Sequence, residues 1–200
     1  MTLTFTFDFE KTRAALLHLA SKEIMEFTKY KAVKLLFLAD REHLFRFGRP
    51  ITGDSSDALP YGPVPSHMLS TLGGMETILS EDGLPDQVSV DARTLAKSFV
   101  LETGKHPTYR AIETPDLDQL SESDIMVLDK IAEEFGHRAF DEIYNFTHAL
   151  KAYATVWQEG STRRKFPMKF EDFFLDAPDR QFMLEEMIEN QAIREAFPSP

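Results

Sequence analysis

The chain has 200 residues, 42% of them hydrophobic, and a formal net charge of −11 at pH 7. This size predicts one domain spanning 1–200 with a sizeable core, in which 166–200 form a C-terminal helical extension. The absence of cysteine excludes disulfides and cysteine nucleophiles and is typical of a cytoplasmic protein. The acidity argues against nucleic acid as the main partner, and the apolar runs fall far short of the roughly 20 residues that span a bilayer.

Two helices are predicted at the start of the chain. The first covers 9–21. The second follows Thr28, a candidate N-cap, and is so apolar that we expect it to be the buried centre of the fold. Its inward face repeats at three- and four-residue steps, and a second apolar face adjoins it. The predicted inward positions are Val33, Leu36, Phe37, Leu44 and Phe47, and the adjoining ones are Leu35, Leu38 and Phe45.

Asp40 lies within the apolar arc of this central helix. Burying a charged group without a partner destabilises a fold by roughly several kcal/mol, so the Asp40 carboxylate needs a hydrogen-bond or ion-pair partner. We predict that it is a structural anchor, accepting hydrogen bonds from backbone amides of the following loop, from Arg49 or from the Tyr61 hydroxyl.

A proline-rich elbow follows the central helix. Gly48 and Pro50 end the helix, residues 51–54 form a turn, and the run from Pro60 onward is extended because each proline fixes its own φ. A stiff rim of this kind binds a partner at little ordering cost. The candidate partner-binding residues are therefore Tyr61, Gly62, Pro63, Val64 and Pro65. The alternative is that the elbow only routes the chain and packs Tyr61 on the central helix.

The rest of the chain predicts more helices and one β-hairpin. Ser66 caps a short helix that Gly73 and Gly74 end, and a second short helix follows. Residues 83–86 form a loop. Strands at 98–103 and 108–114 form a hairpin that packs on the helices or pairs with 87–90. Ser121 begins a capping-box helix that ends at Gly136. Further helices are predicted at 139–158 and 179–197. The fold class is mainly α with a small β-hairpin (α+β), a compact helical bundle around the buried central helix.

Phenylalanines crowd into the segment 166–175, which is charged and bounded by proline. Such a density of aromatic side chains needs cover. Either the segment folds back on the core, which we favour, or it is an exposed patch for another chain.

Three short motifs in order, KLLFLAD (34–40), FGRPITGD (47–54) and ALPYGPVPS (58–66), resemble the SocA-like antitoxin family, also called the Panacea domain, which includes proteins labelled phage-associated. The resemblance covers about Lys11 to Trp157. It implies an antitoxin of a toxin–antitoxin system that neutralises a co-encoded toxin protein by direct binding, without catalysis or a cofactor. Some members of the family are thought to act as adaptors that deliver the toxin to a protease, so a protease is a second implied partner.

Catalytic signatures are sparse in the sequence. Asp40 and His43 form half of a carboxylate–imidazole metal site that His67 or His148 would have to complete, and no dense ligand motif accompanies them. A metal-dependent hydrolytic enzyme is therefore the first alternative to the antitoxin. A DNA-binding regulator is the second, and the net acidity argues against it. We expect no catalytic residue, no metal and no cofactor.

Overall fold

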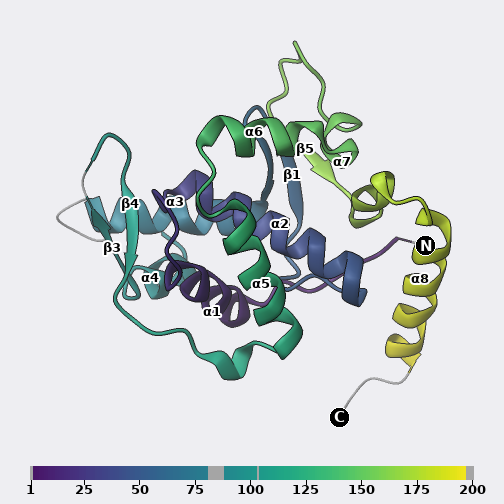
Figure 1. Cartoon of the computed structure of the whole chain (residues 1–200), viewed down its shortest axis with the longest axis horizontal. Coiled ribbons are helices and arrows are strands. Elements are labelled where there is room, and N and C mark those ends of the chain that lie inside the picture. Colours follow the sequence, from purple (N-terminus) through teal and green to yellow (C-terminus); the bar gives the residue numbers. More distant parts are fainter. Residues whose placement is uncertain (1, 81–87, 103, 197–200) are drawn as a thin grey trace.

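The computed structural model describes residues 2–80, 88–102 and 104–196. It is mainly helical, with two small antiparallel sheets, and the central helix α2 (Lys29–Phe47) runs through its middle (Figure 1). The predicted α+β class with a buried central helix is confirmed. Across the described residues, we find no helix whose length and hydropathy would suit a bilayer crossing.

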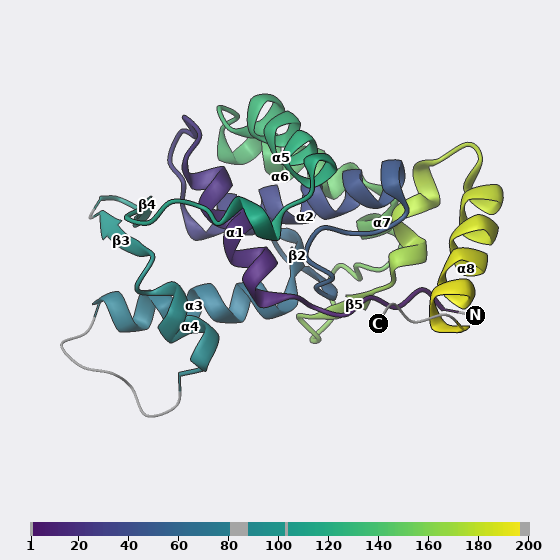
Figure 2. The ribbon, with the colours of Figure 1, turned by 90° about the horizontal axis from the view of Figure 1, so that it is seen from below.

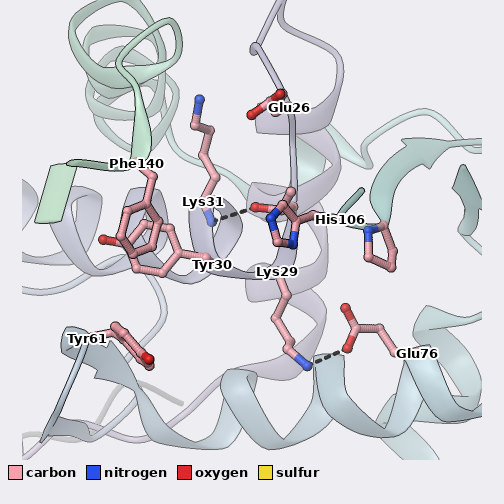
Figure 3. A pocket seen from close by; sticks show the side chains of 10 residues that line it. Glu26, Lys29, Tyr30, Lys31, Tyr61, Glu76, His106 and Phe140 are labelled. Atoms are coloured by element: carbon pink, nitrogen blue, oxygen red, sulfur yellow. Dashed lines mark hydrogen bonds and ion pairs between the residues drawn. The ribbon is translucent and has the colours of Figure 1, made fainter. Parts of the chain in front are cut away.

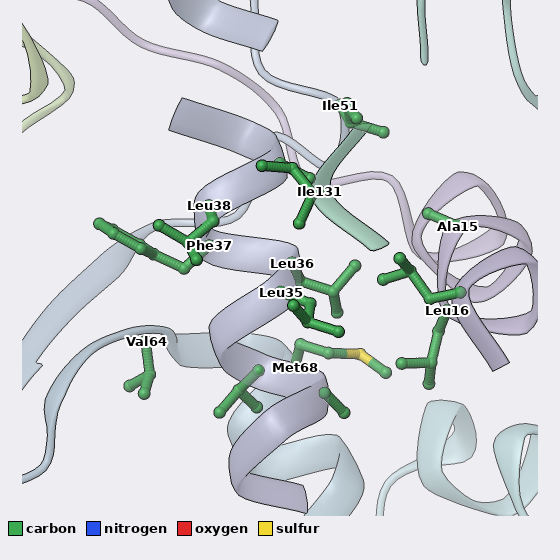
Figure 4. Close-up of a cluster of buried hydrophobic side chains, with 14 of the residues drawn as sticks. Ala15, Leu16, Leu35, Leu36, Phe37, Leu38, Ile51, Val64, Met68 and Ile131 are labelled. Atoms are coloured by element: carbon green, nitrogen blue, oxygen red, sulfur yellow. The ribbon is translucent and has the colours of Figure 1, made fainter. Parts of the chain in front are cut away.

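Helix α2 is buried on most of its circumference. The Thr28 side chain caps its first turn, and Gly48 ends it in the left-handed conformation with φ 69°. Side chains from α1 (Phe9–Ala20), α3 (Ser66–Ser80) and α5 (Glu122–Phe135) surround it (Figure 4). Each fully buried leucine stabilises the fold by roughly 2 kcal/mol relative to an exposed one. The prediction that Phe47 faces inward is wrong. Its side chain is 42% exposed, because it lies in the last turn of α2, beyond the part of the helix that the other helices cover.

Helix α5 begins with the capping box that the sequence predicts. The Ser121 hydroxyl accepts from the Asp124 backbone amide, and the Asp124 carboxylate accepts from the Ser121 amide. A short 3-10 helix, η1 (Leu117–Gln119), precedes it. Helices α1 and α5 then cover one side of α2. The Asp124 carboxylate of α5 joins all three helices, because it contacts Lys11 of α1 and His43 of α2.

The elbow contains regular structure that the sequence analysis missed. Strands β1 (Ser56–Leu59) and β2 (Gly62–Pro65) form a tight hairpin, and β5 (Phe166–Met168) pairs with the other edge of β1. The backbone of the elbow is extended, as predicted, but it forms strands that are hydrogen-bonded in a sheet instead of a free-standing loop. Prolines occur in β2 because this strand lies at an edge of the sheet, where a missing N–H costs no ladder hydrogen bond.

Helix α3 is one continuous helix, so the prediction of two short helices is wrong. A side chain at Gly74 would meet the Cβ of Ala92 at 2.9 Å and a methyl carbon of Val88 at 3.1 Å. The glycine therefore permits the close approach of α4 (Val90–Leu95) and does not end the helix. The predicted loop at 83–86 lies outside the described residues.

The second hairpin is present where predicted. Strands β3 (Phe99–Glu102) and β4 (Thr108–Ala111) pair antiparallel, and a single bridge joins Thr28 to Thr108. Val90 begins helix α4, so the alternative in which the hairpin pairs with 87–90 is wrong as far as the described residues extend. The hairpin instead packs on α1 and α3, which gives its inner face the cover that an isolated hairpin lacks.

The predicted helix at 139–158 is divided into α6 (Phe140–Ala149) and α7 (Lys151–Ala154). Leu150 separates them with an extended backbone, φ −63° and ψ 128°. No glycine or proline marks this break. It turns the chain so that the Tyr153 hydroxyl donates to the Leu59 carbonyl at the end of β1, 2.9 Å away.

The phenylalanine-rich segment folds back on the core. Beyond β5 it forms the 3-10 helix η2 (Phe170–Asp176), whose Phe173 and Phe174 are buried against α2. Helix α8 (Arg180–Ala196) then packs beside η2 and the N-terminal segment at one end of the molecule (Figure 2). The Thr4 amide donates to the Gln191 side chain across this contact.

Candidate functional site

Asp40 lies buried at the base of the elbow. One carboxylate oxygen accepts from the backbone amides of Ile51 and Thr52, each at 2.8 Å, and the other accepts from the Thr52 hydroxyl. Of the three partners that the sequence analysis proposes for Asp40, the structure shows the first, the backbone amides of the loop. Burial raises the pKa of Asp40 to about 6, although the hydrogen bonds from Thr52 and Ile51 act to lower it.

The same loop continues into the start of α3. The Asp54 carboxylate accepts from the backbone amides of His67 at 3.1 Å and Met68 at 2.9 Å, which caps α3. The Thr52 hydroxyl in turn accepts from the Asp54 amide at 3.1 Å. Two buried carboxylates thus hold the ends of the loop, one toward α2 and one toward α3, and so position the strand that follows.

Arg49 pairs with Asp124, not with Asp40. The fully buried Asp124 carboxylate lies 2.8 Å from the Lys11 ammonium, 3.0 Å from the Arg49 guanidinium and 3.1 Å from His43 Nε2. Burial alone would raise the pKa of Asp124, but hydrogen bonds from His43, Lys11 and Ser121 hold it well below its usual range. This cluster ties α1, α2, the elbow and α5 together.

The hairpin turn rests on a buried lysine. The Lys34 side chain is fully buried, and its ammonium donates to the Pro63 carbonyl at 2.7 Å. Burial lowers the pKa of Lys34 well below its usual value. Gly62 has φ 92°, and a side chain there would meet the Lys34 nitrogen at 2.6 Å and the Thr147 hydroxyl at 3.0 Å. Only glycine suits this backbone position.

Helices α6 and α7 hold the turn from its other side. The His148 ring lies between Tyr144 and Tyr153, and its Nε2 is 3.2 Å from the Pro60 carbonyl. Its Nδ1 is 2.8 Å from the Tyr144 carbonyl. Together with the bond from Tyr153 to β1, these contacts leave the turn little freedom to move.

The supported turn presents Tyr61, which is 65% exposed, at the edge of a pocket of about 630 Å³. The pocket lies at the N-terminal end of α2 (Figure 3). Its lining comes from α2 and the loop before it, the hairpin turn, α3, the β3–β4 loop and the first residue of α6. The lining residues are Glu26, Thr28, Lys29, Tyr30, Lys31, Tyr61, Glu76, His106, Pro107 and Phe140.

One side of the pocket is aromatic. The Tyr30 and Phe140 rings are 4.4 Å apart between centroids, and the Tyr61 and Phe140 rings are 6.4 Å apart, edge to face. Figure 3 shows these three side chains grouped opposite Lys29 and Glu76. Phe140 is 48% exposed, so two of the three rings offer substantial surface to another molecule.

The opposite side is polar. The Lys29 ammonium pairs with one carboxylate oxygen of Glu76, and the Tyr109 hydroxyl donates to the other at 2.8 Å. Burial and the hydrogen bond to Glu76 raise the pKa of Tyr109 well above its usual value. The pocket therefore joins an apolar wall to an ordered charged pair, a combination typical of binding sites.

The structure separates the predicted rim into exposed and buried parts. Tyr61 projects into solvent, whereas Gly62, Pro63, Val64 and Pro65 are all buried in β2. Of these five, only Tyr61 presents its side chain at the surface. The pocket also contains residues that the sequence analysis did not select, chiefly Tyr30 and Phe140. Tyr30 is the second residue of the central helix α2 and Phe140 is the first residue of α6, and nothing in the chain order indicates that they meet.

The proposed metal half-site is not assembled. Asp40 contacts the loop amides, and the ring nitrogens of His43 face the Arg49 carbonyl and the side chains of Ser123 and Asp124. His67 pairs with Asp91, and His148 faces two backbone carbonyls. Among the residues that the structure describes, no three His, Asp or Glu side chains are grouped as metal ligands.

A family model described as antitoxin SocA-like, Panacea domain, matches residues 33–153. This range contains most of α2, the β1–β2 hairpin, α3 to α6, most of α7 and the Asp124 cluster apart from Lys11. No curated protein and no solved structure matches the chain. The chain belongs to the SocA-like Panacea-domain antitoxin family.

Proposed function

We propose that this protein is an antitoxin that neutralises a co-encoded toxin by binding it directly through the aromatic pocket. Membership of the antitoxin family supports the general role. The observation that carries the binding mode is the meeting of Tyr30, Tyr61 and Phe140 around one pocket. Aromatic side chains at the centre of an interface contribute most to binding energy, so exposed rings beside a hollow are the natural contact for a partner.

Rigidity supports the same conclusion. Tyr61 is presented by a two-strand hairpin whose turn is held by Lys34, His148 and Tyr153. A contact surface that is already ordered loses little conformational entropy on binding, which increases affinity for the same contacts. We propose that the two buried carboxylates, Asp40 and Asp54, serve this presentation as structural anchors, with Arg49 securing the start of the elbow.

Direct binding is sufficient for neutralisation, and no catalytic step is needed. Delivery of the bound toxin to a protease is a further step that the same surface contact permits. The two modes differ in one observable: blocking leaves the amount of toxin in the cell unchanged, whereas delivery shortens its lifetime. We propose the cytoplasm as the place of action and the whole chain, 1–200, as the functional unit, with 166–200 as its C-terminal extension.

Co-expression tests this function directly. The open reading frame next to this gene is induced alone and together with the present chain, and growth is measured. We expect growth arrest in the first case and rescue in the second, with a complex of both proteins seen by native mass spectrometry. Rescue without a complex, or no rescue at all, would overturn the proposal.

A further inference from the structure

The lysines that line the pocket have direct hydrogen-bond or ion-pair partners, whereas one of its carboxylates, that of Glu26, has none among the residues that the structure describes. The Lys29 ammonium pairs with Glu76. The Lys31 ammonium donates to the backbone carbonyls of Met25 and Gly136, the latter at 3.1 Å, and Figure 3 shows its side chain extending away from Lys29 and Glu76. Both ammonium groups are therefore already engaged, Lys29 by a carboxylate and Lys31 by two backbone carbonyls, and neither points freely toward an incoming anion.

Carboxylates at the same pocket are less engaged. Glu26 is exposed, and within the described part of the chain it takes part in no direct ion pair or side-chain hydrogen bond. Its backbone has φ 50°, and its carbonyl accepts from the Thr28 amide at 2.6 Å, so a tight turn holds the residue beside the pocket. Asp141 follows Phe140 and acts electrostatically on the Tyr30 hydroxyl. Glu26 and Glu142 act electrostatically on the Lys31 ammonium without contacting it. The carboxylates at and around the pocket still outnumber its two lysines, so the local charge is negative, as is that of the whole chain.

Aromatic faces and an available carboxylate together favour one chemical group. A guanidinium group stacks on the face of a tyrosine or phenylalanine ring within about 6 Å of its centre and pairs with a carboxylate through its edge. The chain itself uses this geometry elsewhere: the Arg41 and Arg138 guanidinium groups lie 4.7 Å and 4.4 Å from the centres of the Phe45 and Phe135 rings.

We propose that the pocket receives an arginine side chain of the toxin, stacked on the exposed rings of Tyr61 and Phe140 and attracted by the carboxylates of Glu26 and Asp141. This inference rests on the proposed function and names the chemistry of the partner. It implies that the toxin surface in the interface is basic, which matches the net charge of −11 on this chain.

A set of short peptides tests the chemistry without the toxin. Ac-Gly-Arg-Gly-NH₂ is titrated into the full chain, and the ring resonances of Tyr30, Tyr61 and Phe140 are followed by NMR. The matched peptides replace arginine by citrulline, which has the same shape without the charge, or by leucine. We expect the arginine peptide to shift these rings at lower concentration than either control, and the preference to weaken as salt is added.

Two variants and their controls locate the effect. Tyr61→Ala should weaken binding of the arginine peptide by about five-fold, and Glu26→Gln by about two- to five-fold. Phe182→Ala is the matched aromatic control, since Phe182 is 67% exposed on α8 and Tyr61 is 65% exposed. Glu189→Gln, also on α8, is the matched charge control. Neither control variant should change the binding.

The outcomes separate this inference from the proposed function. Equal binding of the arginine, citrulline and leucine peptides, or no ring shifts with any of them, overturns the arginine assignment even if the toxin complex forms. If the arginine peptide binds selectively and the adjacent gene product does not bind, the proposed function fails and the assignment of the pocket stands.

Discussion

The Lys34 ammonium occupies the space that a side chain at Gly62 would need. The two atoms would approach to 2.6 Å if Gly62 carried a Cβ. Since the Lys34 amine also donates to the Pro63 carbonyl, a buried lysine of α2 constrains both the conformation and the position of the hairpin turn. Tyr61, the residue just before Gly62, owes its place at the edge of the pocket to this arrangement.

Gly62→Ala should therefore both destabilise the protein and displace Tyr61. A non-glycine residue at φ 92° costs about 1–3 kcal/mol in backbone strain alone, and the collision with the buried lysine adds to it. Urea unfolding measures the loss. Gly73→Ala is the control, because Gly73 lies inside α3 with nothing within 4 Å of the added carbon. It should stabilise the protein by about 0.5–1 kcal/mol. Equal effects of the two changes would contradict the account of the turn.

Asp40→Ala should lower the free energy of unfolding by about 2–4 kcal/mol, since it leaves the buried amides of Ile51 and Thr52 without an acceptor. Asp40→Asn keeps an oxygen for both amides and should cost much less. Chemical denaturation of the three proteins at neutral pH makes the comparison. If the alanine variant is as stable as the wild type, Asp40 is not a structural anchor.

The stability of the protein should also depend on the protonation of Asp40. Burial raises its pKa from 3.8 in the unfolded chain to about 6 in the fold, so the folded state binds the proton more tightly. The resulting stabilisation is fully present below about pH 4 and is lost as the pH rises through 6. Relative to Asp40→Asn, the wild type should lose roughly 3 kcal/mol over this range. A constant difference between the two proteins from pH 4 to pH 7 would show that the carboxyl titrates normally.

Asp124 should show the opposite dependence on pH. Its pKa is depressed, so its contribution is present above its unfolded pKa of 3.8 and is lost as the pH falls further. Asp124→Asn should destabilise the protein by about 2–3 kcal/mol at pH 7, because Lys11 and Arg49 lose their common partner. Lys130→Gln, which removes a surface pair with Glu42, should change stability far less. Thermal unfolding of the wild type and both variants at pH 7 and at pH values below 3.8 tests this.

The sequence predicts those features whose causes are local. The cap at Ser121, the left-handed end of α2 at Gly48 and the apolar faces of α2 follow from residue type and spacing. The need of Asp40 for a partner also follows from the sequence, and the structure contains that partner in the amides of Ile51 and Thr52. In each case the informative residues lie within about fifteen positions of one another.

Features that depend on distant segments were not predictable in this way. Taken alone, Gly74 predicts a helix end, whereas the structure requires a glycine there because Ala92 approaches so closely. Leu150 breaks a helix without any breaker residue, and β1 becomes the middle strand of a sheet only because β5, more than a hundred residues later, pairs with it. The pocket could not be predicted for the same reason, since Tyr30, Tyr61 and Phe140 come from three elements far apart in the chain and meet only in the fold.

The most direct test of the central claim is the affinity of this chain for the toxin, measured by calorimetry for the wild type, Tyr61→Ala and Phe182→Ala. All three proteins should unfold at similar denaturant concentrations, because both rings are exposed. We predict that Tyr61→Ala weakens binding by ten-fold or more, on the order of the loss at an interface hot spot, and that Phe182→Ala leaves it unchanged. Wild-type affinity of Tyr61→Ala, or an equal loss in both variants, would contradict binding through the aromatic pocket.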